Sequence, residues 1–522
     1  MFRLTIKRLF SQILVLMLLH RNIVFVGLSV IVMLFLYSLY QRIPHIDDAW
    51  IGEQVFWLDQ DGVVMNVLMK NYSDNHNGLI AYHKAFVHSG LWAVQLFGFS
   101  LWVLKSVSLF YLLVFFGIFY YYLVKLKKII TSKQFIPIAI LLLLEPHIFE
   151  YAFVFRPEIM LMTTGFLSFV FLEYSFKSDK FKTIFVVLSS ILASISTLVH
   201  LNGVVFVIAG GLILIIKKQN RNMAWYILTS LPFVFLYFSH LDSVSGIYHW
   251  YNQLMAYNSG TVDVGFNLNS LVNILLKPFE EHLRFFHSPK EISLSLLLLT
   301  TLILGFKTIR RKMPLLLTYT FILVIGLGFI APVKTAKYLI PFLPFFTIMV
   351  VLIVNEFWKT TSKNYFFIPK TKEAISILVV LILFLGVSFS YDGYLSFQKF
   401  TPVSNNDIIK QYVKKPTKEA IILAPMTFIF NEIHNYKEIV SLMSFNERSK
   451  TNSQIKSLQF FDINEEEGID YILINEHYID KFNLGPLYIG DNAGNYLVVG
   501  KSDELTVLVK NELENALSEY LN

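Results

Sequence analysis

Residues 22–40 read NIVFVGLSVIVMLFLYSLY, a stretch without a charged side chain. Its length matches the roughly 20 apolar residues that a helix needs to cross a bilayer. It is too long and too apolar for the core of a signal peptide, and no small-residue cleavage site follows it, so we expect a retained membrane helix. The segment Pro44-His45-Ile46-Asp47-Asp48-Ala49-Trp50 comes shortly after it. Two adjacent acids are therefore placed at a membrane surface.

The same composition continues through most of the chain. Hydrophobic residues make up 55% of its 522 residues and charged residues only 16%, whereas a soluble protein carries roughly a quarter charged residues. The mean hydropathy is +0.55. We predict an all-α polytopic membrane protein with about eleven transmembrane helices, because backbone groups inside lipid must bond to one another. After the first, the predicted helices lie near residues 102–124, 134–151, 157–176, 183–200, 201–217, 223–240, 291–306, 313–331, 338–355 and 374–391.

Lysine and arginine positions predict the orientation of these helices. Basic clusters fall in alternate connecting segments, which the positive-inside rule assigns to the cytoplasm. They lie at residues 3–8, 125–133, 177–182, 217–221, 307–312 and 359–372. The N-terminus is then cytoplasmic, and the loops 41–101 and 241–290 are extracytoplasmic, as is the C-terminal segment. The net charge of +7 is accounted for by these clusters and does not indicate a nucleic-acid partner.

Residues 392–522 are more polar and predict a small α/β domain outside the membrane, which follows a transmembrane domain of residues 1–391. We expect strands at Ala420–Ala424, Tyr471–Ile474 and Tyr496–Val499, and helices at Asp407–Lys414 and Glu504–Leu521. The chain has no cysteine. Disulfides, thiolate metal sites and cysteine nucleophiles are thereby excluded.

Asp47 and Asp48 form the first candidate site. A carboxylate here can act as a general base toward an acceptor hydroxyl or can hold a divalent metal ion. The alternative is a solvated helix start, where acids interact favourably with the helix dipole, and spacing alone does not decide between these. Arg156-Pro157-Glu158 has two similar interpretations, since Pro157 suits the first turn of a helix. Arg156 and Glu158 can instead point into the same cavity as Asp47.

Basic and aromatic residues on the same side form further candidates. Lys84, in Tyr82-His83-Lys84, can bind a lipid phosphate or can simply extend along the interface to reach water. Lys334, Lys337 and Tyr338 allow the same two interpretations. His200-Leu201-Asn202-Gly203 is a polar break between two apolar stretches, either a tight turn or a device that aims His200 at a substrate.

Several absences narrow the function. The predicted spans hold almost no ionisable residue at mid-depth, since Lys105, Glu145 and Glu173 fall near an interface. Ion-coupled transporters place such groups near the midplane. Phosphate loops, dinucleotide fingerprints, HExxH and GxSxG are also missing. The polar chemistry is concentrated on the extracytoplasmic side, which favours an enzyme acting there over a pump.

In their order, these motifs resemble those of the GT-C class of integral membrane glycosyltransferases. The resemblance is to bacterial relatives of the protein O-mannosyltransferases and to the lipid A aminoarabinose transferase, over roughly residues 20–355. Five elements carry it: Asp47-Asp48-Ala49, the stretch from His83-Lys84-Ala85 to Leu96-Phe97-Gly98, Arg156-Pro157-Glu158, His200-Leu201-Asn202-Gly203, and Lys337-Tyr338-Leu339-Ile340-Pro341-Phe342-Leu343-Pro344. Three positions depart from the family pattern: Asp48 replaces a glutamate, Ala85-Phe86 replaces paired prolines, and Lys337 replaces an arginine.

The resemblance implies transfer of a sugar from a polyprenyl-phosphate donor to a protein, lipid or glycan acceptor, with inversion at the anomeric carbon. The place would be the outer face of the bacterial cytoplasmic membrane. Asp47 would be the general base, and Asp48 and Glu158 would orient the catalytic site. A metal ion, if one is used, would be held by Asp47 and Glu158.

The same resemblance implies how the donor is held. The donor phosphate, whose negative charge grows as it leaves, would be held by Lys84, Arg156, His200 and Lys337. Further substrate contacts would come from His83, Asn202 and Tyr338.

Other functions use similar features. A flippase or transporter of a lipid-linked saccharide needs a continuous polar path through the helices, and the apolar spans argue against one. A non-catalytic subunit of a surface-polysaccharide assembly complex would tolerate replacement of the acids. A polysaccharide polymerase or ligase uses the same donors, and the sequence does not separate it from a transferase.

Overall fold

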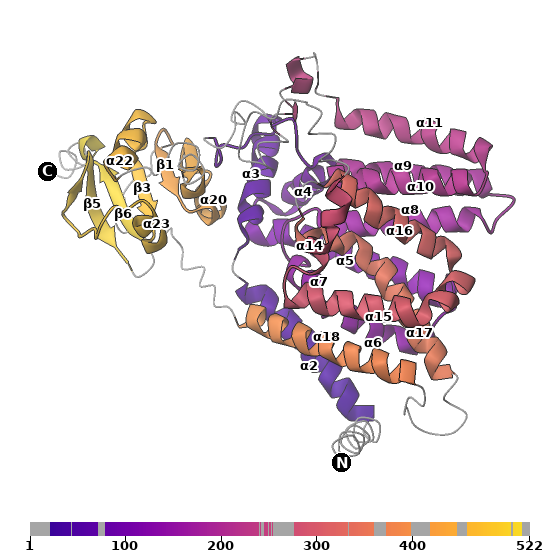
Figure 1. The fold of residues 1–522 in the computed structure, drawn as a ribbon. Helices are drawn as coiled ribbons and strands as arrows, with labels where there is room; N and C mark the ends of the chain where they lie inside the picture. The colour runs from indigo at the N-terminus through magenta and orange to yellow at the C-terminus, as the bar shows by residue number, and fades with distance from the viewer. Residues whose placement is uncertain are drawn as a thin grey trace.

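A computed structural model gives the structure of two successive parts of the chain, a helical bundle and a smaller sheet domain (Figure 1). The described residues are 21–42, 44–70, 79–239, 241, 245–248, 250, 251, 253, 276–331, 334–359, 372–397, 418–445, 457–502 and 505–513. The helix predicted at Asp407–Lys414 lies outside these residues.

Local sequence signals start many of the bundle helices. Ser100 accepts a hydrogen bond from the amide of Val103 and caps the start of α5. A capping box of Thr131 and Gln134 starts α6 in the same way. The long elements are α2 (Arg21–Gln41), α5 (Leu101–Tyr120), which continues as η2 (Tyr121–Leu126), α6 (Ser132–Leu143), α8 (Glu158–Ser175), α9 (Lys182–Val199), α10 (Val204–Ile216), α11 (Asn220–Tyr237), α15 (Pro289–Lys312), α16 (Pro314–Ile330), α17 (Leu343–Lys359) and α18 (Lys372–Ser396).

Each of the eleven predicted spans overlaps one of these helices. The third span is interrupted at Glu145, whose carboxylate caps a separate short helix, α7 (Pro146–Tyr151). Among the described residues, five helices are long and apolar enough to cross a membrane. Four other apolar helices are shorter. The long ones are Leu101–Leu126, Lys182–Val199, Pro289–Lys312, Ala336–Phe357 and Ile375–Ser396. The predicted number of crossings stays a prediction.

Large apolar side chains lie on the outside of the bundle. On α11, Trp225, Leu228, Leu231 and Phe235 are all exposed. A water-soluble protein would rarely expose so continuous an apolar face. Lipid is the solvent that suits it, and the chain is a membrane-integral protein.

The core of the bundle is centred on α8, which is buried along most of its length. Rings of Phe166 and Phe169 pack against Phe345 of α17 and Tyr319 of α16. A side chain at Gly165 would collide with the ring of Phe206, so glycine allows α8 and α10 to approach closely.

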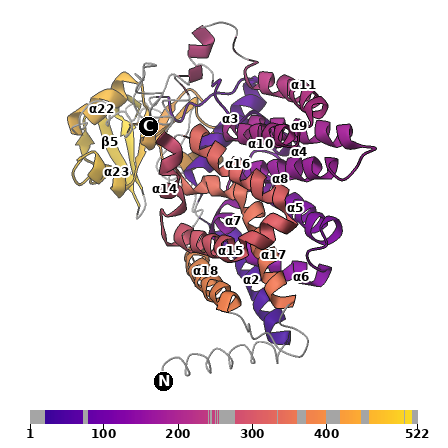
Figure 2. The same cartoon turned by 45° about the vertical axis from the view of Figure 1, so that its right-hand side comes forward.

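Short elements gather at the end of the bundle nearest the sheet domain (Figure 1, Figure 2). This end, which we call the sheet-domain end, positions the predicted site residues. Its short elements are α3 (Ile46–Asp61), α4 (Lys84–Phe97), α7, η3 (Leu201–Gly203), η4 (Lys277–Glu281), α14 (His282–Phe285) and η5 (Ala336–Phe342).

Helix α4 (Lys84–Phe97) is amphipathic. One of its faces is buried, while Trp92, Leu96 and Phe97 are 64%, 75% and 75% exposed. An aromatic and apolar face beside a membrane bundle suits the lipid interface.

The C-terminal part is a six-stranded mixed sheet in the order β2-β1-β3-β6-β5-β4. Strands β2, β1 and β3 run parallel, and β6, β5 and β4 join them as antiparallel strands. The elements are β1 (Ile421–Ala424), η6 (Met426–Phe428), α20 (Ile429–Glu432), β2 (Glu438–Ser441), α22 (Ser457–Glu466), β3 (Tyr471–Ile474), α23 (Glu476–Lys481), β4 (Asn492–Ala493), β5 (Tyr496–Lys501) and β6 (Thr506–Lys510). The α/β domain is thus confirmed, and all three predicted strands are present.

The closing helix predicted at Glu504–Leu521 is wrong over Thr506–Lys510, which form strand β6. This strand lies between β3 and β5 and is buried over Thr506–Val509. Its Thr-Val-Leu-Val sequence is rich in β-branched residues and apolar without a gap, as in strands covered on both faces. Pairing with β3 and β5 therefore determines the conformation of these residues, although the residues that follow them have a helical pattern.

Candidate active site

Helix α3 begins at the predicted acidic pair, and His45 caps it. The Nδ1 atom of His45 accepts a hydrogen bond from the amide of Asp47 at 3.1 Å, and Asp48 Oδ2 accepts one from the amide of His45 at 2.7 Å. Burial, with Arg156 nearby, lowers the pKa of His45, which keeps the ring neutral and able to accept this bond. A helix therefore starts at the acidic pair, with Asp47 in its first turn, but it is not a solvated start, because Asp47 and Asp48 are both buried.

Asp48 is fully buried and is bound on both of its oxygens. Besides the His45 amide, its Oδ1 accepts a hydrogen bond from the amide of Phe155 at 2.6 Å, and Lys105 Nζ lies 3.6 Å from Oδ2. Asp48 thus fastens the start of α3 to the turn that precedes Arg156. These contacts favour a structural role, and the catalytic role predicted for Asp48 stays a prediction.

Arg156 joins the two other predicted acids. Its Nε and Nη2 atoms donate to Glu158 at 3.0 and 2.7 Å, and its Nη1 donates to Asp47 Oδ2. Asp47, Arg156 and Glu158 are 8%, 5% and 0% exposed, so water screens this cluster little. A guanidinium has five N–H bonds in a fixed fork. Three bind described residues here, so two have no partner in the described part of the chain and can bind a further anion.

Two histidine rings lie beside this cluster. His83 stacks on His200 with ring centroids 4.6 Å apart, and Tyr338 meets His200 edge to face at 5.4 Å. The Nδ1 atom of His200 accepts a hydrogen bond from the amide of Asn202 at 3.0 Å. The proton of a neutral His200 is therefore on Nε2, where it can be donated to a substrate anion. A side chain at Gly203 would collide with the Ser196 carbonyl, so this tight turn requires glycine.

Lys337 adds positive charge to the same cluster. Its ammonium lies within electrostatic range of Arg156 and Glu158, and 6.0 Å from the ring of Tyr338. Residues from five distant stretches of sequence therefore meet at the sheet-domain end. They are Asp47, His83, Arg156, Glu158, His200, Asn202, Lys337 and Tyr338, and we call them the acid–base cluster.

Lys84 points elsewhere. Its Nζ donates to the Leu236 carbonyl at 3.1 Å and to Ser239 Oγ at 3.3 Å, at the end of α11. The rings of Tyr82 and Tyr237 are each 5.8 Å from it. Burial lowers the pKa of Lys84 to about 8. Its predicted contact with a donor phosphate gains no support from these contacts and stays a prediction.

Arg284 is a candidate that the sequence did not single out. It is fully buried on α14, with its guanidinium 5.4 Å from the centroid of the Tyr338 ring and 3.3 Å from Glu281. The sequence feature that could have identified Arg284 is a charged residue among apolar ones, in Leu283-Arg284-Phe285-Phe286. Through Tyr338, Arg284 adjoins the acid–base cluster.

The candidate metal ligands Asp47 and Glu158 are both bound to Arg156, and their role in metal binding stays a prediction. Among the described residues, no group of three or more acidic, histidine or cysteine side chains is placed to hold a metal ion. Arg156 lies between Asp47 and Glu158 and binds both. A metal ion held by these two acids would have to displace the guanidinium.

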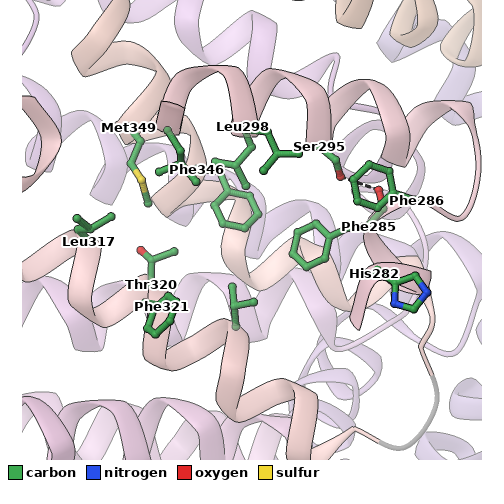
Figure 3. A pocket seen from close by; sticks show the side chains of 13 residues that line it. His282, Phe285, Phe286, Ser295, Leu298, Leu317, Thr320, Phe321, Phe346 and Met349 are labelled. Carbon is green, nitrogen blue, oxygen red and sulfur yellow. Dashed lines mark hydrogen bonds between the residues drawn. The ribbon is translucent and has the colours of Figure 1, made fainter. Parts of the chain in front are cut away.

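An apolar cavity of about 300 Å³ is lined in part by Phe285, the residue that follows Arg284 in the sequence (Figure 3). It lies among α14, α15, α16 and α17 and is lined by His282, Phe285, Phe286, Ser295, Leu298, Leu299, Leu302, Leu317, Thr320, Phe321, Val324, Phe346 and Met349. Its two hydroxyls are turned to the backbone, since Ser295 donates to the Phe285 carbonyl and Thr320 to the Leu316 carbonyl. The wall is therefore apolar and suits a hydrocarbon chain.

No protein family model matches the chain, and no curated protein matches it significantly in sequence. Solved structures do match it. ArnT from Cupriavidus metallidurans bound to undecaprenyl phosphate is similar with a TM-score of 0.59 and 12% identity, over 93% of this chain and 98% of that one. The apo state of the same protein gives a TM-score of 0.59 and 12% identity, over 93% and 97% of the two chains. The chain has a fold similar to that of ArnT.

The oligosaccharyltransferase of Archaeoglobus fulgidus in its apo form is also similar, with a TM-score of 0.48 and 11% identity, over 86% of this chain and 69% of that one. At such identities the likeness to ArnT concerns the fold. The resemblance to the GT-C class that the ordered motifs predict is confirmed at this level.

The burial of His83 predicts an acid-sensitive fold. Burial lowers the pKa of His83 to about 4, while the nearby Glu158 opposes and Lys337 supports this shift. An unfolded histidine titrates near 6.5, so between about pH 6.5 and 4 only the unfolded chain binds this proton and stability falls as the pH is lowered. Replacing His83 with glutamine should flatten the pH dependence of thermal unfolding in this window. His287→Gln, on an exposed histidine, serves as the control, and an unchanged profile for His83→Gln would contradict the assignment.

Proposed function

We propose that this chain is a glycosyltransferase that moves a sugar from a polyprenyl-phosphate donor to an acceptor at the outer face of the bacterial cytoplasmic membrane. The observation that carries the proposal is the Asp47 carboxylate, which Arg156 contacts while Glu158 holds the same guanidinium by a two-bond fork. A base and an anion-binding group are thus fixed side by side in a buried place. The ArnT-like fold supports the choice of reaction class.

In the proposed reaction, Asp47 takes the proton of the acceptor hydroxyl as its oxygen attacks the anomeric carbon. The bond from that carbon to the phosphate oxygen breaks, and polyprenyl phosphate leaves with the electron pair. Direct attack inverts the anomeric configuration. Negative charge grows on the phosphate during this step, and fixed positive groups stabilise such charge without reorganising. The two unused N–H bonds of Arg156, the Nε2–H of His200 and the ammonium of Lys337 are suited to that task.

Glu158 and Asp48 act by orientation in this scheme. Glu158 fixes the plane of the Arg156 guanidinium, and a bidentate carboxylate pair is the strongest way to do so. Asp48 holds the start of α3 against the Phe155 amide. Neither needs to exchange a proton with the acceptor.

The apolar cavity of Figure 3 is our proposed place for part of the polyprenyl chain. One of its lining residues, Phe285, follows Arg284, which adjoins Tyr338 of the acid–base cluster. A donor can therefore lie with its phosphate in the cluster and its first isoprene units in the cavity. The positive-inside distribution of lysine and arginine supports placing this end of the bundle outside the cytoplasm.

Gene deletion followed by mass spectrometry of surface glycans, glycolipids and glycoproteins tests the proposal. Loss of one sugar from one class of molecule, restored by the parent chain and not by Asp47→Asn, is the expected result. Restoration by Asp47→Asn would contradict the proposed chemistry. Accumulation of a lipid-linked sugar on the inner leaflet alone would instead indicate a flippase.

Filling the cavity should weaken donor binding selectively. Leu298→Trp places a larger side chain in a wall that is already apolar, and it should raise the KM for a long-chain donor several-fold with little change in kcat. A soluble donor with a short prenyl chain should be affected less, because it leaves the cavity empty. Leu228→Trp on the exposed face of α11 is a suitable control. Equal effects on both donors would contradict this location of the chain.

A further inference from the structure

Helix α3 connects the acid–base cluster with the sheet domain. Its first turn carries Asp47, and its middle is enclosed on two sides. At Gly52 an added Cβ would lie 2.8 Å from Leu104 of α5 and 3.3 Å from Phe430 of α20. Glycine therefore lets the bundle and the sheet domain both approach α3 closely. The ring of His434 also meets Phe56 of α3 at 5.0 Å.

Glu53, one residue further along α3, is a buried carboxylate outside the acid–base cluster. It is 1% exposed, and its Oε1 accepts hydrogen bonds from the amides of Val67 and Leu68 at 2.8 and 3.0 Å and from Trp57 Nε1 at 3.0 Å. Burial raises the pKa of Glu53 to about 8. Burying a carboxyl group is costly unless its oxygens are bound, and this one is bound mainly by the backbone of a single short segment.

That segment, residues 66–70, which we call the strap, continues to the sheet. The amide of Ser441 in β2 donates to the Leu68 carbonyl at 3.0 Å, and Lys70 Nζ lies 3.2 Å from Glu438 in the same strand. β2 is the edge strand of the sheet. The strap is thus joined to the edge strand β2 by one backbone hydrogen bond and one ion pair.

The apolar contact is continuous with these bonds. One buried cluster combines residues of α3 and the strap with residues of the sheet domain. It includes Ala49, Phe56, Leu68, Met69, Phe428, Ile429, Ile433 and Tyr436. Glu53 links α3 to the sheet domain through hydrogen bonds, because it binds the strap that the sheet holds.

We infer that Glu53 is a positioning residue, through which the docked sheet domain fixes α3 and so places the Asp47 carboxylate for proton transfer. The two residues lie about 9 Å apart along the helix, at 1.5 Å per residue. A rigid helix transmits a displacement over that distance. The inference rests on the proposed function, since it concerns how well the base is placed.

Glu53→Ala and Glu53→Gln test this role. Alanine leaves the amides of Val67 and Leu68 without their acceptor, and should reduce kcat by about 10- to 100-fold, as small misplacements of reacting groups do. Glutamine keeps one acceptor oxygen and should restore most of the rate. The lipid extract of the deletion strain serves as donor and its membranes as acceptor. The KM for the donor should stay within about twofold of the parent, because the phosphate-binding groups are not altered.

A cross-link separates positioning from general loss of structure. The chain has no cysteine, so Lys70→Cys with Glu438→Cys gives a single pair that a short bismaleimide can join. Joining them in the Glu53→Ala chain keeps the strap on the sheet but does not replace the bond between Glu53 of α3 and the strap, so kcat should stay low, whereas a loss caused by release of the strap from the sheet would be reversed. Where Glu53→Ala folds poorly, Lys70→Glu replaces it, and Glu438→Lys added to that variant should restore the rate.

Three results would overturn the inference: a folded Glu53→Ala chain with the parent's kcat, a Lys70–Glu438 cross-link that restores the parent's rate to Glu53→Ala, or a rise in donor KM at constant kcat. A failure of the proposed function gives a different result. In that case Asp47→Asn itself keeps the parent rate of transfer, whatever Glu53→Ala does.

Discussion

Replacing Asp47 with asparagine is expected to lower the rate of sugar transfer by about 10²- to 10⁴-fold, the contribution that a positioned general base commonly makes. Asparagine has nearly the same shape and can still accept a hydrogen bond from Arg156. It cannot take a proton from the acceptor hydroxyl. The fold should therefore persist while turnover is lost, and the KM for the donor should change little. Initial rates with deletion-strain lipid extract and membranes, together with thermal unfolding in detergent, measure the two effects.

Two matched variants on the same helix sharpen this prediction. Asp61→Asn changes an exposed acid at the end of α3 and should leave the rate unchanged. Asp48→Asn puts an amide nitrogen opposite either the His45 or the Phe155 amide, so it should lower stability more than turnover per folded molecule. If Asp48→Asn abolished turnover in a stable chain while Asp47→Asn did not, the roles of the two acids would be exchanged.

The convergence of the site could be predicted because each motif lies at the start or end of a helix. Asp47, Arg156, His200 and Lys337 are separated by long apolar stretches. Lipid forces those stretches to be helices that cross from one side to the other. Counting the crossings therefore assigns the four residues to one side, and the structure places them at one end of the bundle. Nothing in that count depends on fine packing.

The contacts of individual side chains at that end depend on packing and could not be predicted from the sequence. His83 and Lys84 are neighbours, yet His83 stacks on His200 while Lys84 reaches the end of α11. A helix start fixes which turn a residue occupies, but successive residues point in different directions from the helix axis. The sequence likewise gives no distance between Asp48 and the Phe155 amide.

In the sheet domain, too, some elements could be predicted from the sequence and others could not. Three short strands are evident from their apolar runs, but β2, with the sequence Glu-Ile-Val-Ser, and β6 were missed or assigned to a helix. Each acquires its strand conformation from its neighbours, β2 from β1 and β6 from both β3 and β5. Glu53 is a related case, because its importance comes from the strap that folds against it.

Replacing Arg156 with alanine is expected to reduce both stability and transfer. Glu158 is fully buried and Asp47 nearly so, and Arg156 is the cation that binds both. Removing one partner of a buried ion pair commonly costs about 3–5 kcal/mol, since the remaining charge has neither water nor a counterion. The donor phosphate would also lose its planar two-bond partner. Thermal unfolding and initial transfer rates should therefore both fall well below those of the parent.

A second pair of variants separates these two losses. Arg156→Met combined with Glu158→Gln removes the buried charge pair together, so much of the stability lost in Arg156→Ala should return while transfer stays low. Arg156→Lys keeps the charge as a single point and cannot bind Glu158 by two bonds, so an intermediate rate is expected. Full transfer in the Met–Gln double variant would show that Arg156 serves only the fold. If the transfer rate falls whenever the guanidinium is absent, even in a variant whose stability is restored, Arg156 contacts the donor phosphate.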